Sequence, residues 1–570
     1  MLDTVPLTKT AIEVLNPTAD SYGTAKSPLA PRIKSFEGKV VGLLWNGKAQ
    51  GDVALNTVGA AIRERFPTAD VRFYHGTIRF TRELLAQASA ECDVIIGCAA
   101  DCGACTSWLV HDAITFERNG VPTVTIASRG FERDCEATGA AFDMPEIRYV
   151  VVPRVYNAIT AQQAEEQTRP IIDEIIRLAT EEDAAIPSVL GDIEAAELTF
   201  EGDDAVDVIA KFNAFYLQKD WGDGYPLNAP TRARVEALLS GLKADRNDMV
   251  CLLPPGMGHA TVEKVAINAA MAGCADPEEI LVVMAALRAI SKCPKPYDKS
   301  TLMSTGAHAP MILVNGPIAQ RLKVNGARGC LGPGKHNEAN LRIGRAVNLS
   351  LRNIGRWMHG VMDMDSTGTP RKFNLCLAEN EADSPWEPYH VTRGFRPDDD
   401  TVTVFHTSGE WDIPIGGGFL DGYQLLRALA AKMPWGPQSG HVVEALGHST
   451  GEEDQQILLI NPDHAQAVAD YGLSKVEAQK ILHQHNRVRI SDVVEASRGR
   501  ERNGQIRPEW QWIFDLTPAE ARAQTIPATA SPSCMHVVVA GSHTPKPQCY
   551  GMMSAPVTEP VTAAAAGKAN

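Results

Sequence analysis

Short apolar runs alternate with helix-length segments between residues 37 and 185. Apolar runs of this length are typical of strands that are buried on both faces. The predicted strands cover residues 40–44, 71–75, 94–98, 121–127 and 148–152, and the predicted helices cover residues 53–66, 81–90, 105–119 and 161–180. Strands that alternate with helices of this length predict a doubly wound parallel sheet.

The strand order of such a sheet decides where it binds ligands. In a flavodoxin-like order, the first and third strands flank the point where the order reverses, and ligands bind beyond the carboxyl ends of the strands there. Asn46 follows the first predicted strand, and residues 98–105 follow the third. We therefore expect Asn46 and this loop to share one crevice.

The rest of the chain predicts a larger α/β (α+β) unit, because 570 residues exceed what one hydrophobic core holds. Its predicted strands cover residues 311–314, 457–461 and 537–540, and its predicted helices cover residues 261–272, 277–290, 339–353 and 474–483. The expected organisation is an N-terminal arm (1–36), a doubly wound domain (37–185), a linker (186–210), a larger unit (211–545) with a subdomain boundary near residue 420, and a tail (546–570).

Composition narrows the class of protein. The formal net charge of −15 argues against nucleic acid as a partner. No apolar run approaches the roughly 18 residues that a membrane span needs, and the N-terminus lacks the features of an export signal. Twelve cysteines scattered over the chain suit a reducing compartment, so we expect a cytoplasmic protein. The arm either docks on a neighbouring subunit of a homo-oligomer or is disordered.

Cys102 and Cys105 stand where the third predicted strand turns into a helix. Free N–H groups and the positive end of the helix dipole stabilise a thiolate at such a position. We expect Cys102 to act as a nucleophile and Cys105 to resolve the resulting adduct or disulfide. Asp101 precedes the pair and is a further catalytic candidate, while Thr106 is a candidate helix cap and Trp108 a candidate pocket wall.

Two other interpretations of the cysteines stay open. The pair can be small buried residues at a packed turn, since cysteine is among the most buried residue types. It can also bind a metal or an iron–sulfur cluster, because Cys98, Cys102 and Cys105 have the CxxxCxxC spacing of radical SAM enzymes. Against the cluster, Cys98 ends a strand, and Ala104 stands where an aromatic residue is usual.

The segment DCGACTSWLVHD (residues 101–112) resembles the signature of the UGSC (seleno)protein family, in which Sec or Cys-Gly-Ser-Cys precedes Thr-Ser-Trp. The similarity extends to residues 41–52, 119–126, 260–274, 308–317, 376–395 and 461–472, and thus spans most of the chain. This sequence departs from the motif at Ala104, where serine is usual, and has Cys102 where some members carry selenocysteine.

The resemblance implies that Cys102 is the reacting atom, because selenocysteine serves where a strong nucleophile is wanted. A more distant similarity is to the Sec-Gly-Thr-Cys-Thr motif in the selenoprotein B component of glycine and betaine reductases. The selenol of that component cleaves a carbon–nitrogen bond reductively. The resemblance names no substrate for this chain.

Polar residues in the larger unit are candidates for a substrate pocket. Residues 326–334 are glycine-rich and precede a helix, so their free amides are either an anion site or part of a plain connector. Arg345 lies on a basic helix face that is equally explained by solvation. The substrate-binding candidates are Asn46, Thr106, Trp108, His259, His308, Asn315, Arg345, Glu379 and Asn380, and the catalytic candidates are Cys102, Cys105, Asp101, His390 and Glu387.

The leading hypothesis is a thiol-dependent enzyme, an oxidoreductase or lyase, that reductively cleaves a small polar, anionic substrate. His390 or Glu387 would assist the leaving group as an acid. An external thiol reductant would reset the disulfide, and no resident cofactor is assigned, while a metal is a less favoured alternative. The alternatives are a cysteine- or metal-dependent lyase or hydrolase without net redox change, and a thiol carrier or redox-sensing binding protein that is not an enzyme.

Overall fold

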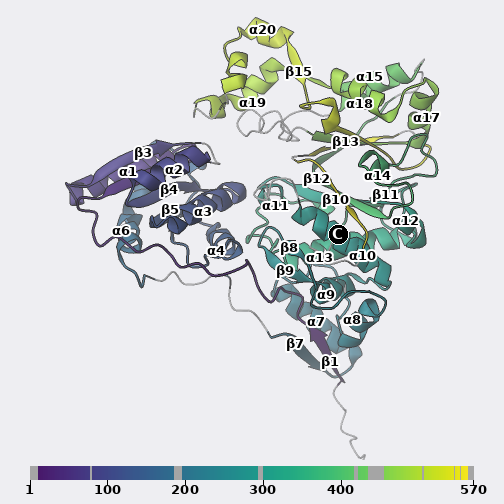
Figure 1. Ribbon diagram of the computed structural model, residues 1–570, viewed down its shortest axis with the longest axis horizontal. Coiled ribbons are helices and arrows are strands. Elements are labelled where there is room, and N and C mark those ends of the chain that lie inside the picture. Colours follow the sequence, from purple (N-terminus) through teal and green to yellow (C-terminus); the bar gives the residue numbers. More distant parts are fainter. Residues whose placement is uncertain are drawn as a thin grey trace, which may run out of the picture.

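The computed structural model describes residues 10–76, 80–184, 190, 195–292, 300–415, 421–433, 455–502, 506, 508–544, 546–552 and 554–562. Figure 1 shows an N-terminal domain (purple to blue) beside a larger unit (teal to yellow), with α3 (Gly103–Arg118) and α11 (Ser300–Met303) in contact between them. Among these residues, none of the helices combines the length and apolarity needed to cross a membrane.

The N-terminal domain is built on a five-stranded, fully parallel sheet. Its strands are β2 (Val40–Trp45), β3 (Asp70–His75), β4 (Val94–Ala100), β5 (Thr123–Ser128) and β6 (Tyr149–Val152). They lie in the order β3-β2-β4-β5-β6. This is the flavodoxin-like order, so the predicted fold is confirmed, and the order reverses between β2 and β4.

Helices cover both faces of this sheet. One face packs on α1 (Gly51–Arg65), α5 (Ala161–Thr168) and α6 (Ile172–Thr180), and the other on α2 (Arg82–Glu91), α3 and α4 (Glu132–Ala141). Neighbouring residues of β2 alternate between the two cores: Leu43 packs in the first and Leu44 in the second. The single helix predicted over residues 161–180 is two helices, separated by the 3₁₀ turn Arg169–Ile171 that contains Pro170.

The N-terminal arm and the linker are joined in one small sheet. β1 (Thr10–Leu15) pairs antiparallel with β7 (Glu197–Gly202), and Tyr216 on α7 (Ala205–Gln218) donates a hydrogen bond from its hydroxyl to the Leu15 carbonyl at 2.8 Å. The prediction of an arm over residues 1–36 is therefore wrong for β1, and the prediction of a linker over residues 186–210 is wrong for β7. Both strands are short, and their pairing is remote in sequence.

The larger unit contains a second sheet, of mixed direction. Its strands are β10 (His308–Asn315), β11 (Cys376–Ala378), β12 (Thr401–Asp412), β13 (Gln455–Ile460), β16 (Met535–Val539), β17 (Gln548–Met552) and β18 (Val557–Pro560). The order is β11-β10-β12-β17-β13-β16, and β18 also pairs with β12. The predicted tail from residue 546 is thus wrong for β17 and β18. The sheet joins strands from both sides of residue 420, so no boundary there divides it.

The pattern of parallel and antiparallel strand pairs is the same from either edge of this sheet. A parallel pair lies at each edge, and β12 and β17 pair antiparallel in the middle. The two edges also meet, because the Asn380 amide donates to the Val539 carbonyl at 2.9 Å and the Gly541 amide to the Gly326 carbonyl at 2.8 Å. The curved sheet thereby encloses an apolar core of its own, which includes Met311, Leu313, Leu377, Phe405, Leu459, Val538 and Tyr550.

Helices pack on the outer surface of this sheet. One group contains α9 (Val262–Ala272), α10 (Pro277–Ser291) and α13 (Glu338–Asn353). The other contains α15 (Gly422–Lys432), α17 (Pro462–Asp470) and α18 (Lys475–His485). The remaining elements are α8 (Arg232–Leu239), β8 (Met249–Leu253), β9 (Gly258–Thr261), α12 (Pro317–Arg321), α14 (Tyr389–Thr392), β14 (Arg487–Arg489), α19 (Ile490–Arg502), α20 (Pro518–Ala523) and β15 (Thr525–Pro527).

Candidate functional site

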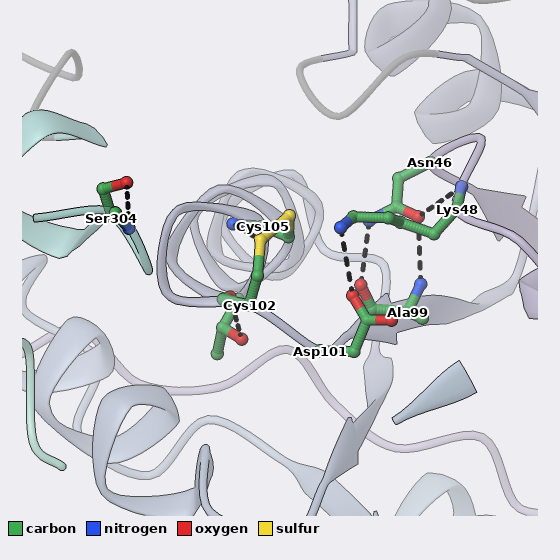
Figure 2. The surroundings of a disulfide bond; sticks show 9 residues. Asn46, Lys48, Ala99, Asp101, Cys102, Cys105 and Ser304 are labelled. Atoms are coloured by element: carbon green, nitrogen blue, oxygen red, sulfur yellow. Dashed lines mark hydrogen bonds and ion pairs between the residues drawn. A yellow bond between two sulfur atoms is a disulfide. The ribbon is translucent and has the colours of Figure 1, made fainter. Parts of the chain in front are cut away.

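The two cysteines lie where β4 gives way to α3, at the predicted position. Cys102 is the N-cap of α3, and its Sγ accepts a hydrogen bond from the Cys105 amide at 3.3 Å. A disulfide joins Cys102 to Cys105 (Figure 2). Cys102 is half-buried, whereas Cys105 is buried. The start of α3 therefore holds one partly exposed cysteine and one enclosed cysteine.

Asn46 braces the end of β4 that leads into this turn. Its Nδ2 donates to the Ala99 carbonyl and its Oδ1 accepts from the Ala99 amide, both at 3.0 Å. Asn46 therefore contacts the loop of residues 98–105 with which it was expected to share a crevice. Because the Asn46 side chain is buried and bonds to backbone, the structure gives it a positioning role rather than the predicted contact with substrate.

Asp101 lies beside the sulfurs and is enclosed by protein. One of its carboxylate oxygens, the Cys102 Sγ and the Cys105 Sγ all lie within 4.8 Å of one another. Lys48 Nζ is 3.4 Å from Asp101 Oδ1, and the Asp101 side chain has no exposed surface. Neither carboxylate oxygen has a hydrogen-bond partner among the described residues. Burial of a carboxylate that has one ion pair and no hydrogen bond lowers the stability of the folded state. Such carboxylates occur at functional sites.

The larger unit contacts the same turn from the other side. A Cβ atom added to Gly103 would lie 1.8 Å from the Met303 carbonyl oxygen and 2.7 Å from Met364 Cγ. Figure 2 places Ser304 across the disulfide from Asn46, Lys48 and Asp101. The cysteine pair is thus located at the junction of the two units.

A buried polar cluster lies on α3 just beyond the cysteines. Ser107 Oγ is 3.0 Å from Asp134 Oδ1, 3.0 Å from Thr138 Oγ1 and 2.9 Å from Met303 Sδ. Burial raises the pKa of Asp134 to about 8, although the hydrogen bonds from Ser107 and Thr138 oppose the shift. A largely neutral Asp134 at pH 7 therefore stands close to the junction.

The other predicted residues near the pair are more enclosed than expected. Thr106 donates from its hydroxyl to the Cys102 carbonyl at 2.7 Å, so it bonds within the helix and does not cap it. Trp108 is buried with its ring edge toward His111, at 5.8 Å between centroids. His308 begins β10, and a Cβ on Gly306 would lie 3.2 Å from His308 Nε2 and 3.3 Å from Ser304 Oγ. His308 is therefore a neighbour of the loop that faces the disulfide.

Three predicted substrate residues lie at the opposite end of β10. Asn315 ends that strand, and seven steps of about 3.3 Å along its eight residues separate Asn315 by roughly 23 Å from the His308 end. Glu379 and Asn380 line a cavity of about 550 Å³ there, together with Lys323, Arg328 and His336. The structure therefore does not bring these residues to Cys102.

Glu379 is held by several partners at that end. Asn315 Nδ2 donates to Glu379 Oε2 at 2.7 Å, the Tyr389 amide donates to the same oxygen at 2.6 Å, and Lys475 Nζ is 3.5 Å from Oε1. Burial raises the pKa of Glu379, and the Lys475 ammonium opposes that shift. These contacts anchor the loop after β11 to the end of β10.

The two predicted acids, His390 and Glu387, belong to this distant end as well. His390 follows Tyr389 in the chain and is fully buried, and its Nε2 bonds to the Arg396 carbonyl at 3.0 Å. The Glu387 carbonyl accepts from Lys475 Nζ at 2.6 Å. Neither residue is placed to protonate a group at Cys102, because the length of β10 intervenes.

His259 and Arg345 have structural partners. His259 Nε2 is 2.7 Å from the Gly23 carbonyl, which ties the N-terminal segment to β9. Arg345 forms a two-pronged ion pair with Asp223, at 2.6 and 2.8 Å. Their assignment as substrate ligands is not supported by this geometry. Conversely, sequence reasoning did not single out Lys48, which pairs with Asp101, or Asp134 and Met303, which packing brings to Ser107.

Comparison with known proteins assigns the domain that carries the disulfide. The family model described as the UGSC family matches residues 13–181. Residues 13–181 are similar to the UGSC family. The matched segment runs from β1 to the end of α6 and contains Asp101, Cys102 and Cys105. It covers about 30% of the 570 residues, so the further resemblances beyond residue 181 lie outside it. A comparison with curated proteins found no match.

Proposed function

We propose that this protein is a thiol-dependent enzyme in which Cys102 is the nucleophile and Cys105 the resolving thiol. The observation that carries the proposal is the Cys102–Cys105 pair in the first turn of α3, half-buried at Cys102 and buried at Cys105. The nine other cysteines that the structure describes are buried and unpaired. Only this pair, among the described cysteines, combines access with a partner sulfur.

The proposed reaction is a reductive cleavage in two steps. The Cys102 thiolate attacks the substrate R–X, a bond forms from sulfur to R, and X leaves with the bonding electrons and takes up a proton. Cys105 then attacks the Cys102 sulfur, the disulfide forms, and R leaves with the electron pair and a proton as R–H. Two thiols are thereby oxidised while R is reduced. An external dithiol returns two electrons and two protons to the pair.

Asp101 is proposed as a base, a role different from that of the leaving-group acid that the sequence assigned to His390 or Glu387. A negative charge so close to the sulfurs opposes thiolate formation by itself, so a fixed carboxylate is a poor support for the nucleophile. The same closeness suits Asp101 to accept the proton that Cys105 loses before the second step. Lys48 Nζ lies 3.4 Å from Asp101 Oδ1, on the same side of the disulfide.

The setting of the reaction belongs to the same proposal. A small polar or anionic substrate would reach Cys102 at the junction with the larger unit, where Lys48 supplies positive charge and Ser304 a hydroxyl group. Buried unpaired cysteines suit a reducing cytoplasm, where a thiol reductant system is at hand. A homo-oligomer is proposed on the sequence argument alone.

The test uses the full chain and two cysteine variants. Reduced Cys105→Ser protein is incubated with a metabolite extract below about 1 kDa, and its intact mass should rise by one adduct on Cys102. The Cys102→Ser protein should gain no adduct and should not consume dithiothreitol in the presence of the extract, whereas a Cys534→Ser control should behave as the parent protein. Undiminished turnover by Cys102→Ser would refute the proposal. A reversible disulfide without turnover would assign a thiol carrier instead.

A further inference from the structure

The group formed by Asp101, Cys102 and Cys105 has the composition of a metal site. Within the part of the chain that the structure describes, this is the one group of three acidic, histidine or cysteine ligand atoms that lie within 4.8 Å of one another. The Asp101 side chain has no exposed surface, and neither of its oxygens is hydrogen-bonded to a described residue. An enclosed carboxylate without hydrogen bonds, beside two sulfurs, is a second and independent sign of a ligand.

We propose that the reduced form of this site binds a zinc ion through Asp101, Cys102 and Cys105, and that disulfide formation closes it. Thiolate sulfur is a favoured ligand for Zn²⁺, and carboxylate oxygen completes many such sites. The proposal rests on the proposed function in one respect: the same pair must alternate between dithiol and disulfide. It adds a regulation of that pair by metal.

The geometry is compatible with a tetrahedral ion. Zinc–sulfur bonds of about 2.3 Å place two sulfur ligands about 3.8 Å apart, and zinc–oxygen bonds are about 2.0–2.2 Å. These separations fall within the 4.8 Å that spans the three ligand atoms. A covalent bond joins the two sulfurs in the disulfide, so this bond must be reduced before both sulfurs can ligate one ion. The disulfide and the metal complex are therefore mutually exclusive states.

Charge favours a divalent cation in the reduced state. Two thiolates and one carboxylate carry three negative charges in a small, largely buried volume, and such a cluster is unstable without compensation. Lys48 at 3.4 Å from Asp101 supplies one positive charge. A divalent cation supplies the other two. Thiols that ligate zinc give up their protons, so zinc binding releases protons.

The ligand set leaves one coordination position open. Three protein ligands plus an open fourth position are typical of reactive or exchangeable zinc, in contrast to the four-ligand sites of structural zinc. Cys102 is half-buried, so the ion can exchange from that side. An external disulfide oxidises the pair by two electrons: the Cys102–Cys105 bond forms, two external thiolates are released, and Zn²⁺ dissociates. The metal thus protects the dithiol and blocks its nucleophile until it is displaced.

Zinc binding is tested on the full chain by competition with a chromophoric chelator. Protein reduced with borohydride and desalted without oxygen should bind one equivalent of added Zn²⁺, and oxidised protein should bind none. Added Co²⁺ should give the near-ultraviolet charge-transfer band of thiolate ligation. Asp101→Asn should weaken zinc binding more than about tenfold. Cys98→Ala, which removes a buried cysteine four residues before Cys102, should bind zinc as the parent does.

Two outcomes would overturn the zinc site. One is equal affinity of the parent and Asp101→Asn proteins, and the other is retention of the bound equivalent by a Cys102→Ser/Cys105→Ser double variant. Either leaves the proposed enzymatic role intact if the Cys105→Ser protein still captures an adduct. Conversely, loss of adduct capture with normal zinc binding would refute the enzyme and keep the metal site.

Discussion

Gly103 lies against the carbonyl oxygen of Met303, so close that a Cβ atom on Gly103 would be 1.8 Å from that oxygen. The glycine between the two cysteines therefore has a role in packing. It lets the larger unit approach the first turn of α3 through backbone. Only the tertiary structure reveals this contact, because Met303 is 200 positions away in the chain.

Replacing this glycine should separate or strain the two units. We expect Gly103→Ala to lower the free energy of unfolding by about 2 kcal/mol or more, since the obstructing atom belongs to backbone and yields little. Urea unfolding followed by tryptophan fluorescence measures the loss, and limited proteolysis reports separation of the units. Gly499 in α19 is the matched control, because a Cβ there would meet no atom within 4 Å. Equal stability of both variants would contradict the close approach.

Alkylation should single out Cys102. After reduction, iodoacetamide should modify Cys102 first. Cys102 is half-buried, and its sulfur accepts a hydrogen bond from the Cys105 amide at the start of α3. Burial raises the pKa of the Cys98, Cys135 and Cys274 thiols well above the usual range of a cysteine, so these three thiols should react slowly with iodoacetamide. Peptide mapping by mass spectrometry locates the label, and Cys293, which lies outside the described residues, is scored separately. Faster labelling of Cys98 than of Cys102 would contradict the assigned access.

Asn46 should matter for stability and for the placement of the cysteines. Asn46→Ala removes both hydrogen bonds to Ala99 and leaves buried backbone groups at the end of β4 unsatisfied. We expect a loss of about 2–4 kcal/mol in the free energy of unfolding, by urea titration. The exposed Asn247 is the matched control, and Asn247→Ala should change stability by less than about 0.5 kcal/mol. A neutral effect at Asn46 would favour a contact with substrate over this structural bracing.

Asp134 should make stability depend on pH with an unusual sign. Because its folded pKa of about 8 lies above the ordinary 3.8, the folded state holds a proton that the unfolded state loses. Stability from this group is therefore full below about pH 4 and falls by up to about 1.4 kcal/mol per pH unit until about pH 8. Asp134→Asn cannot ionise, so its melting temperature should exceed that of the parent by a margin that grows from pH 6 to pH 8.

The surface carboxylate Asp173 provides the comparison for this measurement. Its side chain is 82% exposed on α6, so Asp173→Asn should follow the parent at every pH between 6 and 8. If the Asp134→Asn margin stays constant over that range, Asp134 is ionised in the folded protein throughout. The raised pKa at the junction of the two units would then be excluded.

The local sequence pattern predicted much of the fold of the N-terminal domain. Apolar runs such as Val40–Trp45, which are buried on both faces of the sheet, are typical of parallel strands. Their alternation with helices predicts the doubly wound fold. The cysteine spacing at the end of β4 likewise placed Cys102 and Cys105 at the start of a helix, where the structure has them. These features depend on neighbours within a few residues, which the sequence displays directly.

Packing between remote segments settled the rest. The pairing of β1 with β7, the inclusion of β17 and β18 in the second sheet, and the closure of that sheet at Asn380 all join residues far apart in the chain. The same holds for the distance that β10 sets between Glu379 and Cys102, and for the contacts of Met303 with Gly103 and of Lys48 with Asp101. These contacts form because folding buries side chains and pairs charges from distant parts of the chain. The periodicity of apolar residues along the sequence does not predict such long-range contacts.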